Sequence, residues 1–181
     1  MARLFVAVDL PAETVTLVEP LLGGLPGARF CRAHQLHITL RFFATVPDGE
    51  VEGLAARLQT VTAPPFALAL QGLGVFPGGR KPPRVLWVGL TPQEPLRHLK
   101  DEIDTDAVLG PDPESAERGF RPHLTLARFG APPGPALARY LAAHAGFATP
   151  PVRVDAFHLF RSTLGRDGAT HEVLGRYPLR G

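Results

Sequence analysis

The sequence predicts an α+β fold of two lobes, each a curved antiparallel sheet backed by helices, with a central cleft between the sheets. Two observations predict it. A helix, a strand carrying His-x-Thr-x, a second helix and a pair of strands occur in this order twice, at about residues 1–91 and 92–181. The strands come in pairs rather than in strict alternation with helices, which argues against a doubly wound parallel sheet. A chain of 181 residues without a long linker then fits one bilobal, pseudo-symmetric domain over residues 1–181.

The first half is divided by hydrophobic periodicity and by Gly and Pro. Its first helix begins at Pro11, which suits a first turn, and stops at Gly23-Gly24, while Pro20 disturbs its last turn. The expected elements are a strand at 3–10, a helix at 11–25, a strand at 36–43, a helix at 47–61 and strands at 65–76 and 84–90.

The second half repeats this order without a clear equivalent of the first strand. Its helices show apolar residues at helical spacing, and its strands are rich in β-branched and aromatic residues. The expected elements are a helix at 94–110, a strand at 121–129, a helix at 134–147 and strands at 151–164 and 170–179 around the turn at 165–168.

The two His-x-Thr-x motifs lie in apolar strand segments, HITL and HLTL. Successive side chains of a strand point to opposite faces, so the histidine and threonine of each motif share the face away from the core. In the second motif these are His123 and Thr125. In the first motif strand, alternation places His37, Thr39 and Arg41 on that face, and Ile38, Leu40 and Phe42 on the core face.

Two histidines at matching places of a duplicated fold indicate acid–base chemistry, because imidazole can act as base or acid near neutral pH. A histidine and a threonine two residues apart can also bracket a phosphate group. An ordinary half-exposed polar pair and a non-catalytic RNA-binding module remain open as alternatives. A metal-dependent hydrolase is a third, because His34 and His37 form an H-x-x-H pair, although no third ligand stands at a suitable spacing.

The amino-acid composition excludes few classes of protein. The net charge is +2, but 17 of the 19 basic residues are arginine, whose planar fork suits phosphate; a GC-rich genome or a thermophilic source would account for this as well. The single cysteine, Cys31, can form no internal disulfide. Because no signal peptide or membrane segment stands out, we expect a cytoplasmic protein without a membrane partner.

The chain resembles the RNA 2′,3′-cyclic phosphodiesterases, also called 2′-5′ RNA ligases, of the two-histidine phosphodiesterase superfamily. The resemblance is carried by both HxTx motifs and by segments along nearly the whole chain, which include LFVAVDLP, LGVFPGGRKPPRVLWVGL and FRPHLTLAR. It implies the bilobal fold predicted above, no metal and no cofactor. The implied substrates are RNA with a 2′,3′-cyclic phosphate end or small cyclic nucleotides, opened to a 2′-phosphate, with a reversible ATP-independent ligation. Apart from this resemblance, we expect the protein to be a monomer.

The resemblance also implies residue roles. His37 is the expected proton donor and His123 the expected proton acceptor, while Thr39 and Thr125 contact the phosphate oxygens. Arg128 corresponds to an arginine that contacts phosphate in relatives; simple alternation places it on the core face, so a bulge or a strand end has to turn it. Three further arginines are candidates for contacts with the RNA backbone: Arg32, Arg41 and Arg121.

Overall fold

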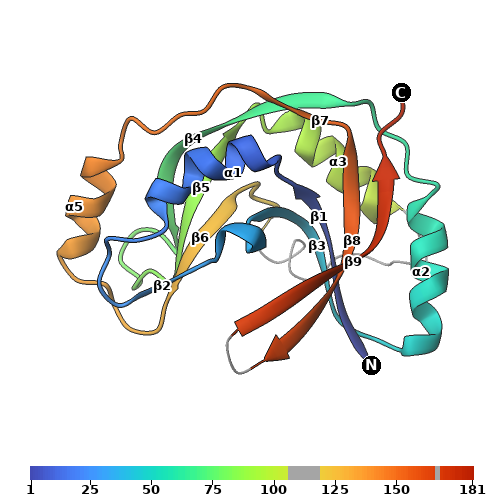
Figure 1. The fold of residues 1–181 in the computed structure, drawn as a ribbon, viewed down its shortest axis with the longest axis horizontal. Helices are drawn as coiled ribbons and strands as arrows, with labels where there is room; N and C mark the ends of the chain where they lie inside the picture. The colour runs from blue at the N-terminus through green and yellow to red at the C-terminus, as the bar shows by residue number, and fades with distance from the viewer. Residues whose placement is uncertain (106–118, 166–167) are drawn as a thin grey trace.

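The computed structural model describes residues 1–105, 119–165 and 168–181 (Figure 1). Two antiparallel sheets make up its strands. The first sheet has, in spatial order, β3 (His37–Val46), β1 (Ala2–Asp9), β8 (Ala156–Gly165) and β9 (Gly168–Pro178). The second has β2 (Ala28–Phe30), β6 (Leu124–Phe129), β5 (Val85–Thr91), β4 (Phe66–Phe76) and β7 (Val152–Val154). The α+β class with two antiparallel sheets is confirmed.

Short helices connect and cover the strands. They are α1 (Ala12–Val18), α2 (Val51–Leu58), α3 (Glu94–Thr105) and α5 (Ala136–Ala143), with single 3₁₀ turns η1 (Glu19–Leu21), η2 (Ala33–Gln35) and η3 (Asp48–Glu50). Helix α3 packs against β3, and α2 packs against β9. In Figure 1, α1 and α3 lie on the upper side of the molecule, while α5 stands apart at one end.

Several predicted boundaries differ from the observed ones. The helix expected at 11–25 ends early, because Pro20 has no N–H to continue it and the chain tightens into η1. The strand expected at 151–164 is interrupted at Asp155, which separates β7 from β8. Strand β2 was not predicted, because it has only three residues. Residues 106–110 of a predicted helix and 166–167 of a predicted turn lie outside the described residues.

Each sheet takes strands from both halves of the sequence. The pair β8–β9 from the second half joins β1 of the first half, and the pair β4–β5 from the first half joins β6 of the second. The internal repeat itself stays a prediction. Because neither half of the chain holds a complete sheet, each sheet forms only when both halves come together.

One apolar core extends through both sheets. On β1, Leu4, Val6 and Val8 are buried in it. The alternate residues Phe5 and Ala7 point to the opposite side, where they form a small separate cluster with Phe160. A strand therefore presents one face to the common core and the other to the side where the motif histidines lie.

Candidate active site

The first HxTx motif lies on the side of the first sheet away from the core. Strand register pairs Thr39 with Ala7 and His37 with Asp9, and cross-strand partners share a face. In the second sheet, Thr125 pairs with Trp87. We call this side of the two sheets, which carries both motifs, the histidine face. As predicted, Ile38 and Leu40 are buried in the core, and so are Leu124 and Leu126 of the second motif.

A bulge follows the first motif and overturns one prediction. Register skips Leu40, so Arg41 pairs with Val6 and lies on the core side, not beside His37. The Arg41 side chain is only 3% exposed and its Nη1 atom lies 2.8 Å from Oδ1 of Asp104 on α3. The prediction that Arg41 shares the face of His37 is wrong, because strict alternation does not allow for an extra residue.

The same bulge moves Phe42 in the opposite direction. Phe42 was expected on the core face, but it pairs with Phe5 and is 37% exposed on the histidine face. Its ring stacks on Phe5 at a centroid distance of 5.9 Å, and the Arg3 guanidinium lies over it at 5.6 Å. An aromatic ring and an arginine are thereby presented together beside the first motif.

A second bulge turns Arg128, as its candidate role required. The β5–β6 register skips Leu126, so that Arg128 pairs with Val85 on the side of Trp87 and Thr125. The Arg128 side chain is exposed. Its charge also acts on both motif histidines, lowering the pKa of His37 and of His123. Arg128 therefore lies on the histidine face, within electrostatic reach of both imidazoles.

Each motif histidine makes the same hydrogen bond. Nδ1 of His37 lies 2.7 Å from the carbonyl oxygen of Gln35, and Nδ1 of His123 lies 2.7 Å from that of Arg121. A carbonyl oxygen can only accept, so Nδ1 carries the hydrogen in both rings. The other nitrogen, Nε2, is then the one that can take up or release a proton.

Aromatic rings surround both imidazoles. The His37 ring stacks on Phe5 at 4.6 Å and meets the His171 ring edge-on at 5.1 Å. The His123 ring meets Phe76 edge-on at 5.0 Å, and Phe76 packs on Trp87 at 5.0 Å. Trp87 can lie this close to β4 because residue 74 is glycine, where a Cβ atom would fall 2.2 Å from the indole ring.

These surroundings lower the pKa of both histidines. Burial lowers the pKa of His37 to about 4, against the opposing effect of its bond to the Gln35 carbonyl; His171, Arg128 and His123 lower it further. Burial also lowers the pKa of His123 from its ordinary value, again against the effect of its carbonyl bond. In the free protein at pH 7 both rings are therefore neutral.

The structure brings the two motifs together. Strands β3 and β6, which belong to different sheets, contact each other (Figure 1). The charge of His123 is close enough to lower the pKa of His37. One region of the histidine face thus holds two imidazoles, each followed two residues later by a threonine, with Arg128 beside them.

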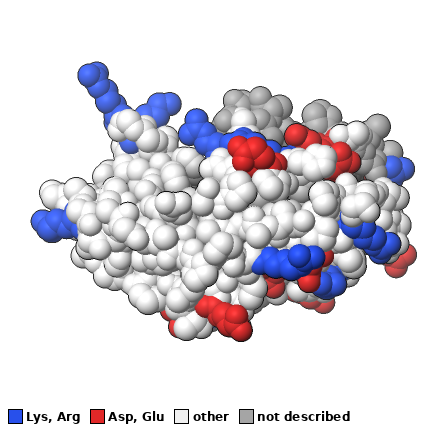
Figure 2. All heavy atoms as spheres, turned by 90° about the horizontal axis from the view of Figure 1, so that it is seen from above, with Lys and Arg blue, Asp and Glu red and all other residues white. Residues whose placement is uncertain are grey.

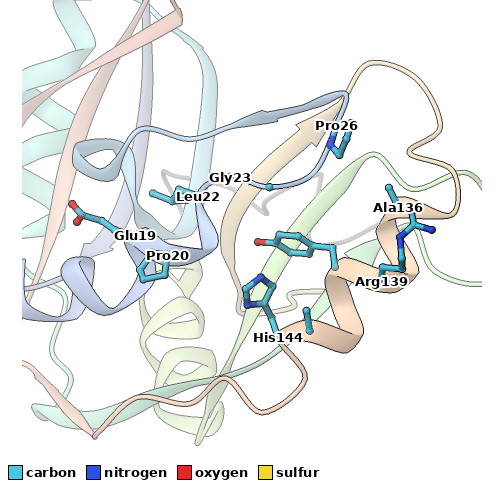
Figure 3. Close-up of a pocket in the computed structure, with 11 residues that line it drawn as sticks. Glu19, Pro20, Leu22, Gly23, Pro26, Ala136, Arg139 and His144 are labelled. Carbon is cyan, nitrogen blue, oxygen red and sulfur yellow. The ribbon is translucent and has the colours of Figure 1, made fainter.

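One hollow lies away from both motifs. It has a volume of about 620 Å³ and lies between the segment Glu19–Pro26 and α5 (Figure 3). Arg139, Tyr140 and His144 line it, and the Tyr140 hydroxyl donates to the carbonyl of Leu21 at 2.5 Å. Neither motif histidine borders this hollow, so we do not assign the chemistry to it.

The remaining sequence candidates contribute less. Arg121 lies beside the second motif, where its guanidinium stands 5.8 Å from the Phe76 ring centroid, and Arg32 is exposed before η2. Burial raises the pKa of the Cys31 thiol, which disfavours a thiolate nucleophile. Among residues 1–105, 119–165 and 168–181, no three His, Cys, Asp or Glu side chains are grouped so that they could hold a metal ion.

Figure 2 shows one face of the molecule, seen from above relative to the view of Figure 1. Seen from above, the described Lys and Arg side chains are scattered among largely uncharged surface and form no single patch (Figure 2). Within the described ranges, no helix has the length and apolar character needed to span a membrane.

Two neighbours of His37 were missed from the sequence. His171 was not among the predicted site residues, because its segment carries no His-x-Thr-x motif, yet β9 brings its ring against His37. Gln35 supplies the carbonyl that accepts from His37. The position of Gln35 two residues before the histidine was visible, but the pairing of β9 with β8, and of β8 with β1, was not.

Fold and site together define a class: a two-sheet α+β protein with a duplicated histidine–threonine motif, suited to acid–base chemistry on a phosphate group. The chain belongs to the 2′-5′ RNA ligase superfamily, whose family model matches residues 11–166. The family predicted from the motifs is thereby confirmed.

Individual relatives agree with this assignment. The chain is 34% identical to the RNA 2′,3′-cyclic phosphodiesterase of Thermus thermophilus, over 99% of this chain and 91% of the relative. It is 32% identical to the enzyme of the same name from Geobacillus stearothermophilus, over 98% of this chain but 57% of that longer relative. Its fold matches the crystal structures of Thermus thermophilus TT0787 (TM-score 0.75, 32% identity) and apo Escherichia coli LigT (TM-score 0.75, 26% identity), each over 99% of this chain and 98% of the other.

Proposed function

We propose that this protein is an RNA 2′,3′-cyclic phosphodiesterase, a phosphoric diester hydrolase in which His37 and His123 act as an acid–base pair. The observation that carries the proposal is the matched setting of the two imidazoles. Each donates Nδ1–H to the carbonyl two residues earlier, which leaves Nε2 for proton transfer, and the two lie within electrostatic reach of each other. The names of the relatives support the same activity.

The reaction is an in-line displacement at phosphorus. Nε2 of His123 takes a proton from the attacking water, the bond from phosphorus to the ribose 3′-oxygen breaks, and Nε2 of His37 gives its proton to that oxygen. The product keeps the phosphate on the 2′-oxygen. If a 5′-hydroxyl of RNA replaces water as the attacking group, the same steps form a 2′-5′ linkage without ATP.

Three side chains are proposed to hold the phosphate oxygens. Thr39 and Thr125 share the face of the histidine of their motif, and Arg128 is turned toward it by the bulge after Thr125. Hydrogen-bond donors of this kind stabilise the negative charge that gathers on the non-bridging oxygens in the transition state. Each threonine therefore lies on the same face as the histidine two residues before it in its motif.

His37 takes up the proton that it later donates from solvent, when bound substrate raises the pKa of its imidazole. In the free protein, burial lowers the pKa of both imidazoles, which are neutral at pH 7. A phosphodiester anion bound between them favours the protonated form of a neighbouring imidazole and raises its pKa. Burial, and to a smaller extent the charge of Arg128, lowers the pKa of His123, which favours a neutral base at that position.

RNA ends are the proposed substrate class, with small cyclic nucleotides as the alternative. Escherichia coli LigT, 26% identical, has been crystallised with phosphate and with 3′-AMP. The exposed Phe42 ring with Arg3 above it is a combination that single-stranded RNA binders use for stacking and charge. We also propose a cytoplasmic monomer; light scattering after gel filtration tests the oligomeric state.

The test is the opening of a synthetic RNA that ends in a 2′,3′-cyclic phosphate, followed by identification of the product. We expect only the 2′-phosphate, because the 3′-oxygen is the leaving group. A 3′-phosphate product would reverse the assignment of the leaving oxygen. RNA binding without turnover would favour the non-catalytic RNA-binding alternative.

A further inference from the structure

Gln35 uses all of its polar groups around the first motif. Its backbone N–H donates to the Arg32 carbonyl at 2.8 Å, and its side-chain Oε1 accepts from the Arg32 N–H at 2.9 Å, which closes the η2 turn. Its Nε2 donates to the carbonyl of Ala169 on β9 at 2.5 Å. Its own carbonyl accepts from Nδ1 of His37 at 2.7 Å.

These bonds tie His37 to the β8–β9 hairpin, far away in sequence. Ala169 belongs to the hairpin and is bonded through Gln35 to the motif, while His171, two residues further on, lies edge-on to the His37 ring at 5.1 Å. The hairpin thus contacts the His37 unit twice, once through its backbone and once through a side chain. The orientation of the imidazole depends on both.

In the second motif, a proline restricts the backbone of the accepting carbonyl. The carbonyl that accepts from His123 belongs to Arg121, and the next residue is Pro122, whose ring fixes its own φ and restricts the residue before it. In the first motif the residue at this place is Leu36, which imposes no such restriction. In the first motif, the hydrogen bonds of the Gln35 side chain restrict the backbone, as Pro122 does in the second motif.

We propose that Gln35 is the positioning residue of His37, which holds the imidazole in the Nδ1–H form by anchoring the accepting carbonyl to the β8–β9 hairpin. This inference rests on the proposed function for its kinetic consequences only. With the Gln35 carbonyl anchored, Nε2 of His37 stays directed toward the phosphate. Without the anchor, the ring no longer keeps the Nδ1–H form, and proton transfer to the leaving oxygen slows while substrate binding persists.

Two variants of Gln35 distinguish the effects of its two side-chain hydrogen bonds. Gln35→Met keeps the size of the side chain and removes both of its hydrogen bonds. Gln35→Glu keeps the acceptor for Arg32 and removes the donor to Ala169. The matched control is Gln59→Met, which replaces an exposed glutamine at the end of α2. Circular dichroism and thermal unfolding check that each variant folds.

Kinetics give the first measurement. We expect kcat of Gln35→Met to fall about 10- to 100-fold, with KM changed less than about 3-fold. Gln35→Glu should fall as well, because the bond to the hairpin is missing. Since the carbonyl bond raises the pKa of His37, its loss in the uncharged variant Gln35→Met should also move the pH optimum to lower pH. The other groups facing His37, namely Asp9, His123, Arg128 and His171, are unchanged in these variants.

Nitrogen NMR of the imidazoles gives a measurement that does not depend on turnover. We expect His37 to lose the pure Nδ1–H form in Gln35→Met, while His123 keeps it. An unchanged His37 tautomer in Gln35→Met, or wild-type kcat in Gln35→Glu, would overturn the positioning role. If the wild-type protein opens no cyclic phosphate, the proposed function fails, and the NMR result still decides the role of Gln35.

Discussion

Phe42 and Arg128 occupy the same place in the two motif strands. Each stands five residues after its histidine, and each reaches the histidine face because the leucine after the threonine, Leu40 or Leu126, is an extra residue in the register. The duplicated bulge gives one strand an aromatic ring and the other a cation at this place. The site is therefore symmetric in its histidines and threonines and asymmetric in what flanks them.

Arg128→Ala should lower kcat/KM about 10²- to 10³-fold, because it removes a donor to the charge of the transition state. Arg128→Lys should recover little of this loss, since an ammonium group cannot make the two parallel bonds of a guanidinium. Steady-state kinetics on the cyclic-phosphate RNA check both. Arg139→Ala, which changes the hollow at α5, should behave as wild type; equal losses in the two alanine variants would contradict the role of Arg128.

His37→Ala and His123→Ala should each lower kcat about 10²- to 10⁴-fold. Because the two act as a unit, the double variant should lose less than the product of the single losses. All three should keep the wild-type circular dichroism spectrum, since both side chains lie outside the common core. Undiminished turnover in either single variant would remove that histidine from the mechanism.

The pH optimum of kcat/KM should lie below 6.5, because this ratio reports the free enzyme, where the pKa of both histidines lies below that ordinary value.

The free energy of unfolding should depend on pH for the same reason. Between pH 6.5 and about 4 the unfolded chain binds a proton that folded His37 does not, so the free energy of unfolding should decrease as pH falls through this window.

Rate profiles and urea denaturation at several pH values check these two expectations. In His37→Ala the decrease in the free energy of unfolding over this window should become smaller. An optimum above pH 7 for kcat/KM would mean that burial does not control the histidines of the free enzyme.

Turnover should survive exhaustive chelation, because the described residues around the motifs include no third metal ligand for His34 and His37. The measurement compares kcat before and after treatment with a chelator and after addition of zinc or manganese. A loss that either metal restores would revive the metal-dependent alternative.

Arg41→Ala should destabilise the fold rather than weaken RNA binding. It removes the buried guanidinium from Asp104, which still has Lys100 as an ion-pair partner, so we expect a loss of about 2 kcal/mol in the free energy of unfolding. Urea denaturation measures this cost, and Arg153→Ala on the exposed side of β7 is the control, with little expected effect. A stable Arg41→Ala variant with a raised KM for RNA would return Arg41 to the substrate site.

The sequence by itself determined the motif strands, the burial of Ile38 and Leu40, and the family. These follow from local patterns, because side-chain alternation and helical spacing are properties of a few consecutive residues. The segments that form β1, β3 and β6 were predictable for the same reason, within a few residues at their ends.

Only the tertiary structure decided which way Arg41, Phe42 and Arg128 point, and which residues surround His37. A bulge is defined by the partner strand, so no alternation within β3 or β6 alone reveals that Leu40 and Leu126 are skipped. Likewise, His171 reaches His37 because β8–β9 joins the sheet of β1, a pairing between segments more than 100 residues apart. Long-range pairing is chosen by the free energy of the whole core, and therefore the side chains that surround the catalytic pair are settled only when both sheets have formed.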